Sequence, residues 1–355
     1  MTPHSKGKTA RAQVRRRQPV ERDAGHLCLS RNGVKWLDLP PIAAKPQPMK
    51  RLSLEQPVED RLSGAILALG NFDGFHLGHQ AVVGRAIQRA AHERRPVIVA
   101  TFDPHPVAFF RPETPPFRLT SLDQREELFA HAGADAMLVF DFDADLAATS
   151  AESFVGDLLA ERLKVSGVVT GSDFTFGRGR AGNAAILSDL GADNGILAET
   201  VAPVLFDGVR ISSGLVREAL KAGDPGTATR MLTRPFAIRG VVIDGDKRGR
   251  DFGWPTANLE LGDYQRPAYG IYAVRVRLDD GSEHDGVASL GVRPMFSPAK
   301  ELLEVHLFDF DGYLYGRTIE TDLVAYLRPE ARFDSVEGLK AQMSQDAEDA
   351  RASLA

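Results

Sequence analysis

The chain has 355 residues, a hydrophobic fraction of 43% and a charged fraction of 26%, values typical of folded globular proteins. This length exceeds one average domain, so two domains are expected. The formal net charge of −5 argues against general nucleic-acid binding, which needs a basic surface. The single cysteine, Cys28, excludes an internal disulfide framework and a cysteine-rich zinc site. It is compatible with the reducing cytoplasm, where we expect the protein to act.

The amino-terminal segment lacks the pattern of a folded domain. Residues 1–20 are basic and contain no carboxylate, which predicts a disordered arm, although a transit peptide would have a similar composition. The residues that follow, up to about 48, are rich in proline and poorly periodic. No run of eighteen apolar residues occurs, so no membrane-spanning helix is expected. We therefore expect residues 1–60 to be a disordered or dispensable extension.

From residue 64, apolar segments alternate with amphipathic ones. Strands are predicted over 64–72, 96–102, 135–142 and 165–171, and helices over 79–95, 121–133 and 150–163. Strands that are apolar throughout and separated by helices indicate a parallel sheet covered on both faces. Ligands of such sheets bind beyond the carboxyl ends of the strands, where polar clusters follow Leu69, Ala100 and Thr170. Residues 61–222 are thus expected to form a Rossmann-like α/β domain.

The pattern changes near residue 234, after a linker expected at 223–233. Apolar and polar residues now alternate and are interrupted by turn signals, and 270–278 with 283–290 form a strong hairpin pattern. An amphipathic helix is predicted over 333–354. Residues 234–355 are therefore expected to form a small antiparallel β-barrel with a terminal helix.

The first chemically informative stretch is "GNFDGFHLGH", residues 70–79, at the predicted change from strand to helix. The amino terminus of a helix favours anions, and Gly70 and Gly78 allow close approach of a ligand to the backbone. His76 and His79 could donate hydrogen bonds to a phosphate under attack. A polar turn with two surface histidines, or a metal-binding pair, would fit the four-residue pattern alone.

The whole string resembles the signature of the HxGH nucleotidylyltransferases, in the version found in bacterial bifunctional riboflavin kinase/FAD synthetases. "TFDPHP" (101–106), "TGSDFTFGRGRAGN" (170–183) and "ISSGLVREAL" (211–220) follow in the order of that family. The resemblance implies adenylyl transfer, in which the FMN phosphate attacks the α-phosphate of ATP and diphosphate leaves. Residues 61–222 would then be an FAD synthetase, or FMN adenylyltransferase, domain.

The resemblance also implies roles for individual residues. The catalytic residues of this domain would be His76, His79 and Arg217, with Arg217 holding the triphosphate through its bidentate guanidinium. The ATP-binding residues would be Gly70, Phe72, Gly78, Ser212 and Ser213. Asp173 and His105 would lie on the flavin side or along the phosphate path.

One position departs from the family pattern. Gly214 stands where relatives usually carry a hydroxyl residue, so a donor to phosphate is missing. A hydrogen bond to a charged group contributes about 1.5–3 kcal/mol, and its loss in the transition state would slow adenylyl transfer by about one to two powers of ten.

The second dense stretch is "GDKRGRDFGWPTANLEL", residues 245–261. Its glycines and basic residues suit a phosphate chain, and the expected ATP-binding residues are Gly245, Lys247, Arg250 and Gly253. Thr256 and Asn258 offer hard oxygen ligands on alternate residues for the Mg²⁺ that accompanies ATP. A solvated hairpin, with Thr256 and Asn258 in turn or capping roles, is the alternative.

This segment resembles the flavokinase signature, and "YGIYAVRV", "GVASLGVRPMF" and "LEVHLFDFDGYLYGRTI" follow in family order. Glu304 matches the catalytic carboxylate of that family. It would accept the proton of the terminal hydroxyl of riboflavin as that oxygen attacks the γ-phosphate; a solvent-facing strand glutamate is the alternative. Arg328 resembles a residue near the flavin pocket. Residues 234–355 would thus be a riboflavin kinase domain.

The resemblance spans roughly residues 60–350 and implies a bifunctional enzyme that makes FMN from riboflavin and then FAD from FMN. ATP with Mg²⁺, riboflavin and FMN would be its small-molecule partners, with no nucleic acid and no membrane, and a homo-oligomer is left open. A kinase with a weakened or regulatory amino-terminal domain is the first alternative. A non-catalytic flavin- or nucleotide-binding regulator is the second, and a cytidylyl- or pantetheine-type transferase would leave the carboxyl-terminal module unexplained.

Overall fold

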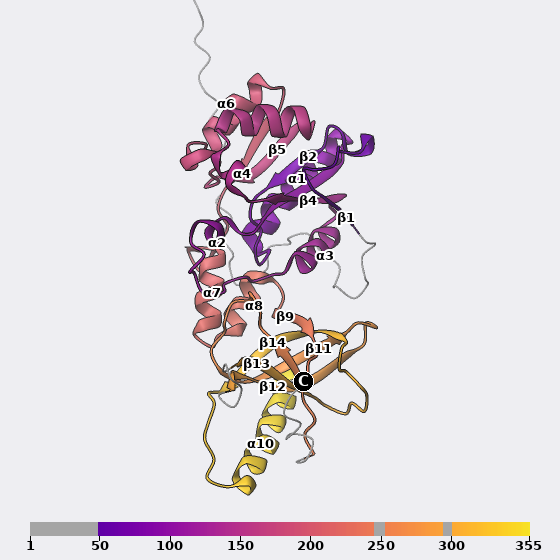
Figure 1. Ribbon diagram of the computed structural model, residues 1–355, viewed down its shortest axis with the longest axis vertical. Helices are drawn as coiled ribbons and strands as arrows, with labels where there is room; N and C mark the ends of the chain where they lie inside the picture. Colours follow the sequence, from indigo (N-terminus) through magenta and orange to yellow (C-terminus); the bar gives the residue numbers. More distant parts are fainter. Residues whose placement is uncertain (1–48, 245–252, 294–299) are drawn as a thin grey trace, which may run out of the picture.

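The computed structural model describes residues 49–244, 253–293 and 300–355. An α/β domain lies at one end and a β-barrel at the other, with helices α7 (Ser213–Lys221) and α8 (Pro225–Leu232) between them (Figure 1). In the described part of the chain, no helix combines the length and the apolar character needed to cross a membrane.

The α/β domain contains the predicted parallel sheet. Its six strands lie in the order β1-β4-β3-β2-β5-β6, and each neighbouring pair is parallel. The strands are β1 (Lys50–Leu52), β2 (Ile66–Leu69), β3 (Val97–Asp103), β4 (Ala136–Asp141), β5 (Gly167–Gly171) and β6 (Leu197–Val201). The chain order reverses beside β2, because β3 lies on one side of it and β5 on the other. Ligands of open α/β sheets bind at such a switch point.

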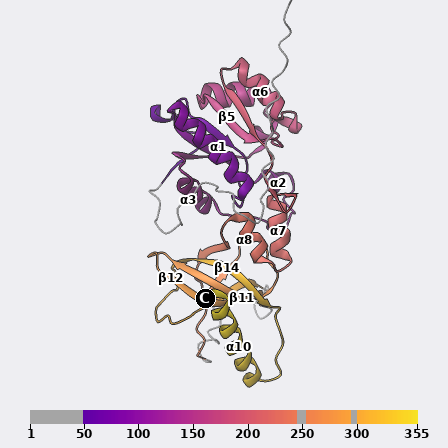
Figure 2. The same cartoon turned by 180° about the vertical axis from the view of Figure 1, so that it is seen from behind.

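Both faces of this sheet are covered, which explains why its strands are apolar throughout. Ile66 and Ala68 pack in the cluster that includes side chains of α1 (Leu77–Glu93) and α3 (Leu122–Ala132). Leu67 and Leu69 point the other way, toward the π-helix η2 (Phe154–Arg162) and α6 (Ala184–Asp193). Figure 2 shows α1 in front of the sheet, where it contacts β2 and β5.

The remaining short elements connect these layers. They are η1 (Asp60–Leu62), α2 (Pro106–Phe110), α4 (Ala144–Ala148), α5 (Ala151–Ser153), η3 (Arg178–Arg180), β7 (Leu205–Phe206) and β8 (Val209–Arg210). The last two pair as a separate antiparallel ribbon.

Two segments differ from expectation, although the domain boundaries themselves stay predictions. Part of the expected extension 1–60 is ordered, because β1 pairs with β4 at the edge of the sheet and Leu52 is buried. A three-residue strand is too short to show a hydrophobic period, so the sequence could not reveal it. The expected linker 223–233 contains α8, which Asp224 caps through the backbone N–H of Thr227.

The carboxyl-terminal domain is a nearly closed antiparallel barrel, as predicted. Its strands lie in the order β10-β13-β12-β11-β14-β9, and a bridge from Ile243 to Asn258 brings the two ends of the sheet together. They are β9 (Phe236–Val241), β10 (Ala257–Glu260), β11 (Gly270–Leu278), β12 (Glu283–Arg293), β13 (Lys300–Leu307) and β14 (Thr318–Arg328). The predicted hairpin is the β11–β12 pair.

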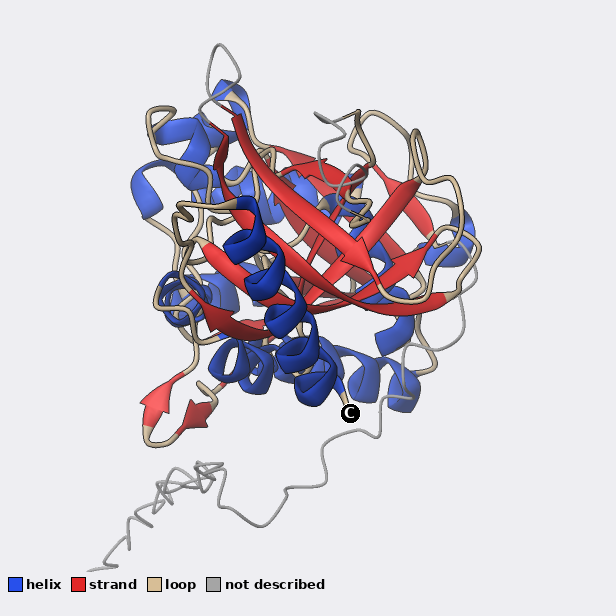
Figure 3. Cartoon of the chain, turned by 90° about the horizontal axis from the view of Figure 1, so that it is seen from below, coloured by secondary structure: helices blue, strands red, loops and turns tan. Residues whose placement is uncertain are grey.

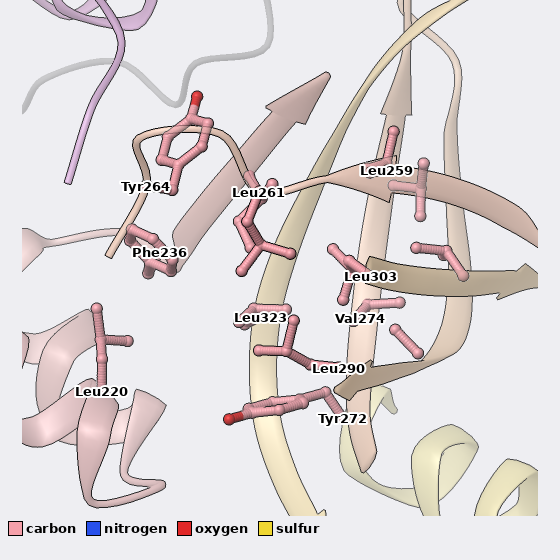
Figure 4. Close-up of a cluster of buried hydrophobic side chains, with 14 of the residues drawn as sticks. Leu220, Phe236, Leu259, Leu261, Tyr264, Tyr272, Val274, Leu290, Leu303 and Leu323 are labelled. Atoms are coloured by element: carbon pink, nitrogen blue, oxygen red, sulfur yellow. The ribbon is translucent and has the colours of Figure 1, made fainter. Parts of the chain in front are cut away.

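The predicted terminal helix is α10 (Val336–Leu354), which lies along the outside of the barrel against β11, β12 and β14 (Figure 3). The largest buried cluster fills the barrel and continues into α7 and α8. Figure 4 shows Leu220 of α7 on the same side of the barrel as Phe236 and Tyr264. The two domains therefore share a hydrophobic core.

Candidate active sites

The histidine pair lies where β2 gives way to α1, beyond the carboxyl end of the sheet. His76 is the amino-terminal cap of α1, and its Nδ1 accepts a hydrogen bond from the backbone N–H of His79 at 3.3 Å. The two imidazole rings stack with their centroids 3.6 Å apart. A Cβ atom at Gly78 would lie 3.1 Å from Cε1 of His76. The glycine between the histidines thus leaves room for the His76 ring at the start of the helix.

Both imidazoles are neutral at pH 7. Burial lowers the pKa of His76 to about 4, and burial followed by the nearby His76 lowers the pKa of His79 well below its usual range. Because Nδ1 of His76 accepts a hydrogen bond, its proton resides on Nε2, which is available as a donor. Among the described residues, Nδ1 of His79 is a buried atom with no hydrogen-bond partner.

Arg217 is held beside the same loop by Asp73, whose importance the sequence did not reveal. The Asp73 side chain is buried, with 2% of the residue exposed, and accepts hydrogen bonds from the backbone N–H groups of Leu119 and Thr120 at 2.9 and 3.0 Å. It also accepts one from Arg217 at 2.6 Å. The Arg217 guanidinium donates to the backbone carbonyl of Phe117 at 2.7 Å and lies over the aromatic ring of the same residue. Asp73 stands in the quoted motif, but its partner is 144 residues away.

The start of α7 is docked on this loop. Ser212 caps the helix through the N–H of Leu215, and the hydroxyl of Ser213 donates to the carbonyl of Asp73 at 2.9 Å. Gly214 is the second residue of the helix, where a Cβ atom would contact only Ser212 Oγ, at 3.5 Å. A hydroxyl residue would therefore fit at Gly214 without steric conflict.

Phe117 connects the Arg217 region to His105. The His105 ring meets the Phe117 ring edge to face at 5.1 Å, and its Nδ1 caps α2 through the N–H of Val107. Burial lowers the pKa of His105 to about 4, so this imidazole is neutral as well. The structure thus brings both His105 and Arg217 into contact with one aromatic ring, and the flavin contact of His105 stays a prediction.

Three other expected residues have roles of their own in the fold. Phe72 is buried and meets the His79 ring at 5.3 Å, so it supports the histidine by packing against it. Gly70 adjoins the Phe72 ring, because a Cβ atom there would lie 3.0 Å from it. Asp173 is largely exposed and forms an ion pair with Arg210. Their expected contacts with ATP and flavin stay predictions.

The second site lies on the barrel. Asn258 of β10 is directly opposite Glu304 of β13, and both side chains point away from the core residues Leu303 and Val305. Thr256 comes just before β10, two residues from Asn258 along the chain. The structure therefore brings together the carboxylate and the amide oxygen that the sequence proposed, with Thr256 next to them.

His306 is a member of this site that the sequence did not single out. Its Nδ1–H donates to the carbonyl of Pro255 at 2.8 Å, and its ring packs against Trp254 with centroids 4.7 Å apart. The imidazole thus fixes the backbone immediately before Thr256. Its presence inside "LEVHLF", two residues after Glu304, was the available signal.

The remaining expected residues divide into two groups. Gly245, Lys247 and Arg250 lie outside the described residues, while Gly253 is described and adopts a left-handed backbone with φ of 83°. The Arg328 guanidinium makes two hydrogen bonds to the Asp346 carboxylate, at 2.7 and 2.6 Å, which fasten β14 to α10. A flavin contact of Arg328 stays a prediction.

The first domain combines a parallel sheet with a histidine pair at the start of a helix, and the second is a barrel with an Asn–Glu cross-strand pair. These are the features of a nucleotidylyltransferase domain fused to a flavokinase domain. The family model described as FAD synthetase matches residues 58–215, and the one described as riboflavin kinase matches residues 232–354. The chain belongs to the family of bifunctional riboflavin kinase/FMN adenylyltransferases. Arg217 lies just beyond the first match.

Relatives with that name are similar over most of their length. The protein of Haemophilus influenzae is 39% identical over 291 residues, which cover 82% of this chain and 94% of the relative. The protein of Pseudomonas fluorescens is 41% identical over 290 residues, which cover 81% and 93%. A crystal structure from Streptococcus pneumoniae, described as a macrolide-efflux protein, has a TM-score of 0.76 and 29% identity, covering 85% of this chain and 99% of that one.

Proposed function

We propose that the two sites act in sequence on one flavin. The chain is a bifunctional riboflavin kinase and FMN adenylyltransferase. The barrel converts riboflavin and ATP to FMN and ADP, and the α/β domain converts FMN and ATP to FAD and diphosphate. The observation that carries the proposal is that one chain assembles both sites: the stacked His76–His79 pair and the Asn258–Glu304 pair.

In the adenylyl transfer, an FMN phosphate oxygen attacks the α-phosphorus of ATP, and the bond to diphosphate breaks. His76 and His79 donate N–H groups to the phosphoryl oxygens, where negative charge grows in the transition state. Because both imidazoles are neutral, they act as preorganised hydrogen-bond donors rather than as cations. Arg217, fixed by Asp73 and by the Phe117 carbonyl, binds the triphosphate with its remaining N–H groups.

In the phosphoryl transfer, the terminal hydroxyl oxygen of riboflavin attacks the γ-phosphorus of ATP, and ADP leaves. Glu304 accepts the hydroxyl proton. The hydroxyl of Thr256 and the amide oxygen of Asn258, near the Glu304 carboxylate, are hard oxygen donors that fit Mg²⁺ and would hold it together with ATP. When bound, Mg²⁺ supplies charge neutralisation on the phosphates.

The kinase-only alternative rested on Gly214. Helix α7 nevertheless begins at Ser213 with its Ser212 cap in place, and both family models match. The same matches disfavour a non-catalytic regulator. We further propose that the protein works in the cytoplasm, with ATP and the flavins as partners and without nucleic acid.

A time course with purified protein, riboflavin, ATP and Mg²⁺ tests the proposal. FMN should rise first and then give way to FAD, as measured by chromatography of the flavins. Glu304→Gln should abolish FMN formation but still convert added FMN to FAD, whereas His79→Ala should stop at FMN. A parallel loss of both reactions in either variant, or no FAD from the unmodified chain, would refute this division.

A further inference from the structure

We propose that Arg234, which the kinase domain contributes, is a positioning residue of the adenylyltransferase site. Arg234 lies in the corner Leu232–Arg234, which joins α8 to β9 and falls within the riboflavin kinase match. The inference rests on the assignment of adenylyl transfer to the His76–His79 site. It adds a dependence of that site on a residue outside its own domain.

The first contact is with the loop that carries the histidines. The Arg234 guanidinium donates to the carbonyl of Gly74 at 2.9 Å and to the carbonyl of Leu232 at 3.1 Å. Gly74 directly follows Asp73, the residue that holds Arg217, and its own N–H donates to Thr120 Oγ1. Arg234 therefore fixes the backbone carbonyl of the residue that follows Asp73, the partner of Arg217.

The second contact is with the first turn of α1. The Gln80 side chain, which follows His79, donates to Thr233 Oγ1 at 2.9 Å and to the Leu232 carbonyl at 3.2 Å. The Phe75 carbonyl lies 2.9 Å from the same nitrogen, so one of the two amide hydrogens is shared between two acceptors. The corner thus makes contacts on both sides of His76, at Gly74 in the loop before α1 and at Gln80 in the first turn of α1. Rotation or withdrawal of the corner would move both attachment points.

The corner itself adopts an unusual backbone. Thr233 has a φ of 64°, in the left-handed region that a β-branched residue rarely occupies. Such conformations persist where surrounding contacts determine them, and they concentrate at functional sites. Here the Thr233 hydroxyl also donates to the Leu232 carbonyl at 2.6 Å, so the strained residue and the loop contacts form one hydrogen-bonded unit.

Charge supports the same arrangement. Burial lowers the pKa of Arg234 to about 10, while the acidic side chains of Glu320 and Asp322 on β14 and of Asp73 in the loop act in the opposite direction. Arg234 is thus charged at pH 7. It lies near acidic side chains of both domains, Asp73 in the loop and Glu320 on β14.

The test uses the full chain, because its two activities control for one another. Arg234→Met removes both donors and the charge, and small displacements of a phosphate site cost up to about 100-fold in rate. We expect kcat/KM for FMN adenylylation to fall 10- to 100-fold, mainly in kcat, while riboflavin phosphorylation stays within twofold. Arg234→Lys, which keeps the charge and a donor, should recover part of the loss.

Arg230→Met is the matched control. Arg230 is an exposed arginine of α8 whose guanidinium donates to Thr227 Oγ1 and lies over the Phe206 ring. It should change neither reaction more than twofold. If Arg234→Met fails to fold, Thr233→Gly removes the hydroxyl contact while tolerating the left-handed backbone, and adenylylation alone should fall severalfold.

Three results would overturn the inference. Equal loss of both reactions, with a lower melting temperature, would make Arg234 a structural link only. Unchanged adenylylation in Arg234→Met or, if that variant is unfolded, in Thr233→Gly would remove its role altogether. Absence of FAD from the unmodified chain would refute the proposed function itself. The reaction of the chain without any substitution, run beside the variants, distinguishes this outcome from the other two.

Discussion

Replacing Asp73 by asparagine keeps the size of a buried side chain but removes its charge and one acceptor oxygen. The carboxylate accepts from the N–H groups of Leu119 and Thr120 and from the guanidinium of Arg217. The amide NH₂ group that the substitution introduces must face at least one of these donors, so one contact becomes repulsive. Arg217, whose side chain is 20% exposed, would lose its carboxylate partner.

The expected magnitudes follow from these contacts. Removing one partner of a buried ion pair costs about 3–5 kcal/mol, and partial exposure of Arg217 favours the lower end of that range. The free energy of unfolding should therefore fall by about 3 kcal/mol, as measured by urea titration followed by circular dichroism. If about 2 kcal/mol of transition-state stabilisation is lost because Arg217 is no longer held, adenylylation slows roughly 30-fold.

The kinase activity of the same chain provides an internal control. FMN formation by the barrel of Asp73→Asn should stay within twofold, measured on the same preparation below its unfolding transition. If Asp73 acts through Arg217, the double variant Asp73→Asn/Arg217→Lys should lose little more adenylylation than the worse single variant. Fully additive losses, or adenylylation within twofold of the unmodified chain in Asp73→Asn, would refute the positioning of Arg217 by Asp73.

Three further predictions concern titration and the helix start. The lowered pKa of His76, about 4 against an ordinary 6.5, gives stability that is complete above pH 6.5 and is lost as the pH falls toward 4. Urea titrations should show a decrease of about 3 kcal/mol from this residue, which His76→Gln should remove. Burial, followed by the Glu320 carboxylate, raises the pKa of Asp322 from its ordinary 3.8 to about 7, so its contribution to stability falls as the pH rises between these two values. Asp322→Asn should raise the melting temperature at pH 8.5 and change it little at pH 4. Gly214→Ser should stabilise α7 by about 0.5 kcal/mol and speed adenylylation up to tenfold, measured as FAD formed from added FMN; unchanged rates would exclude a phosphate contact from this position.

Elements whose pattern is local were predicted from the sequence. The helix over 121–133 is one example, because Ser121 and Gln124 form a capping box and Gly133 ends the helix in a left-handed conformation. The β11–β12 hairpin is another, since both strands and their turn lie within one short stretch. The histidine pair could be identified for the same reason, because His76 and His79 are only three residues apart at the start of α1.

Contacts between distant segments left no such signal. The Asp73–Arg217 pair joins residues 144 positions apart, and the Arg234 contact with Gly74 spans 160. His306 and Pro255 are 51 positions apart. An ion pair or side-chain hydrogen bond needs only one residue at each end, so it produces no periodicity from which a single sequence could identify the partner.

The shared core gives these distant contacts a common consequence. Leu220 of α7 and Phe236 of β9 belong to one buried cluster that also fills the barrel, and α7 carries Arg217. A displacement of the barrel relative to α7 would therefore disturb packing at Leu220 and the hydrogen bonds of Arg234 together. The adenylyltransferase site depends on the kinase domain through two independent kinds of interaction, apolar packing and polar contacts. Fusion of the two domains in one chain thus supplies part of the structure of the first site as well as a second activity.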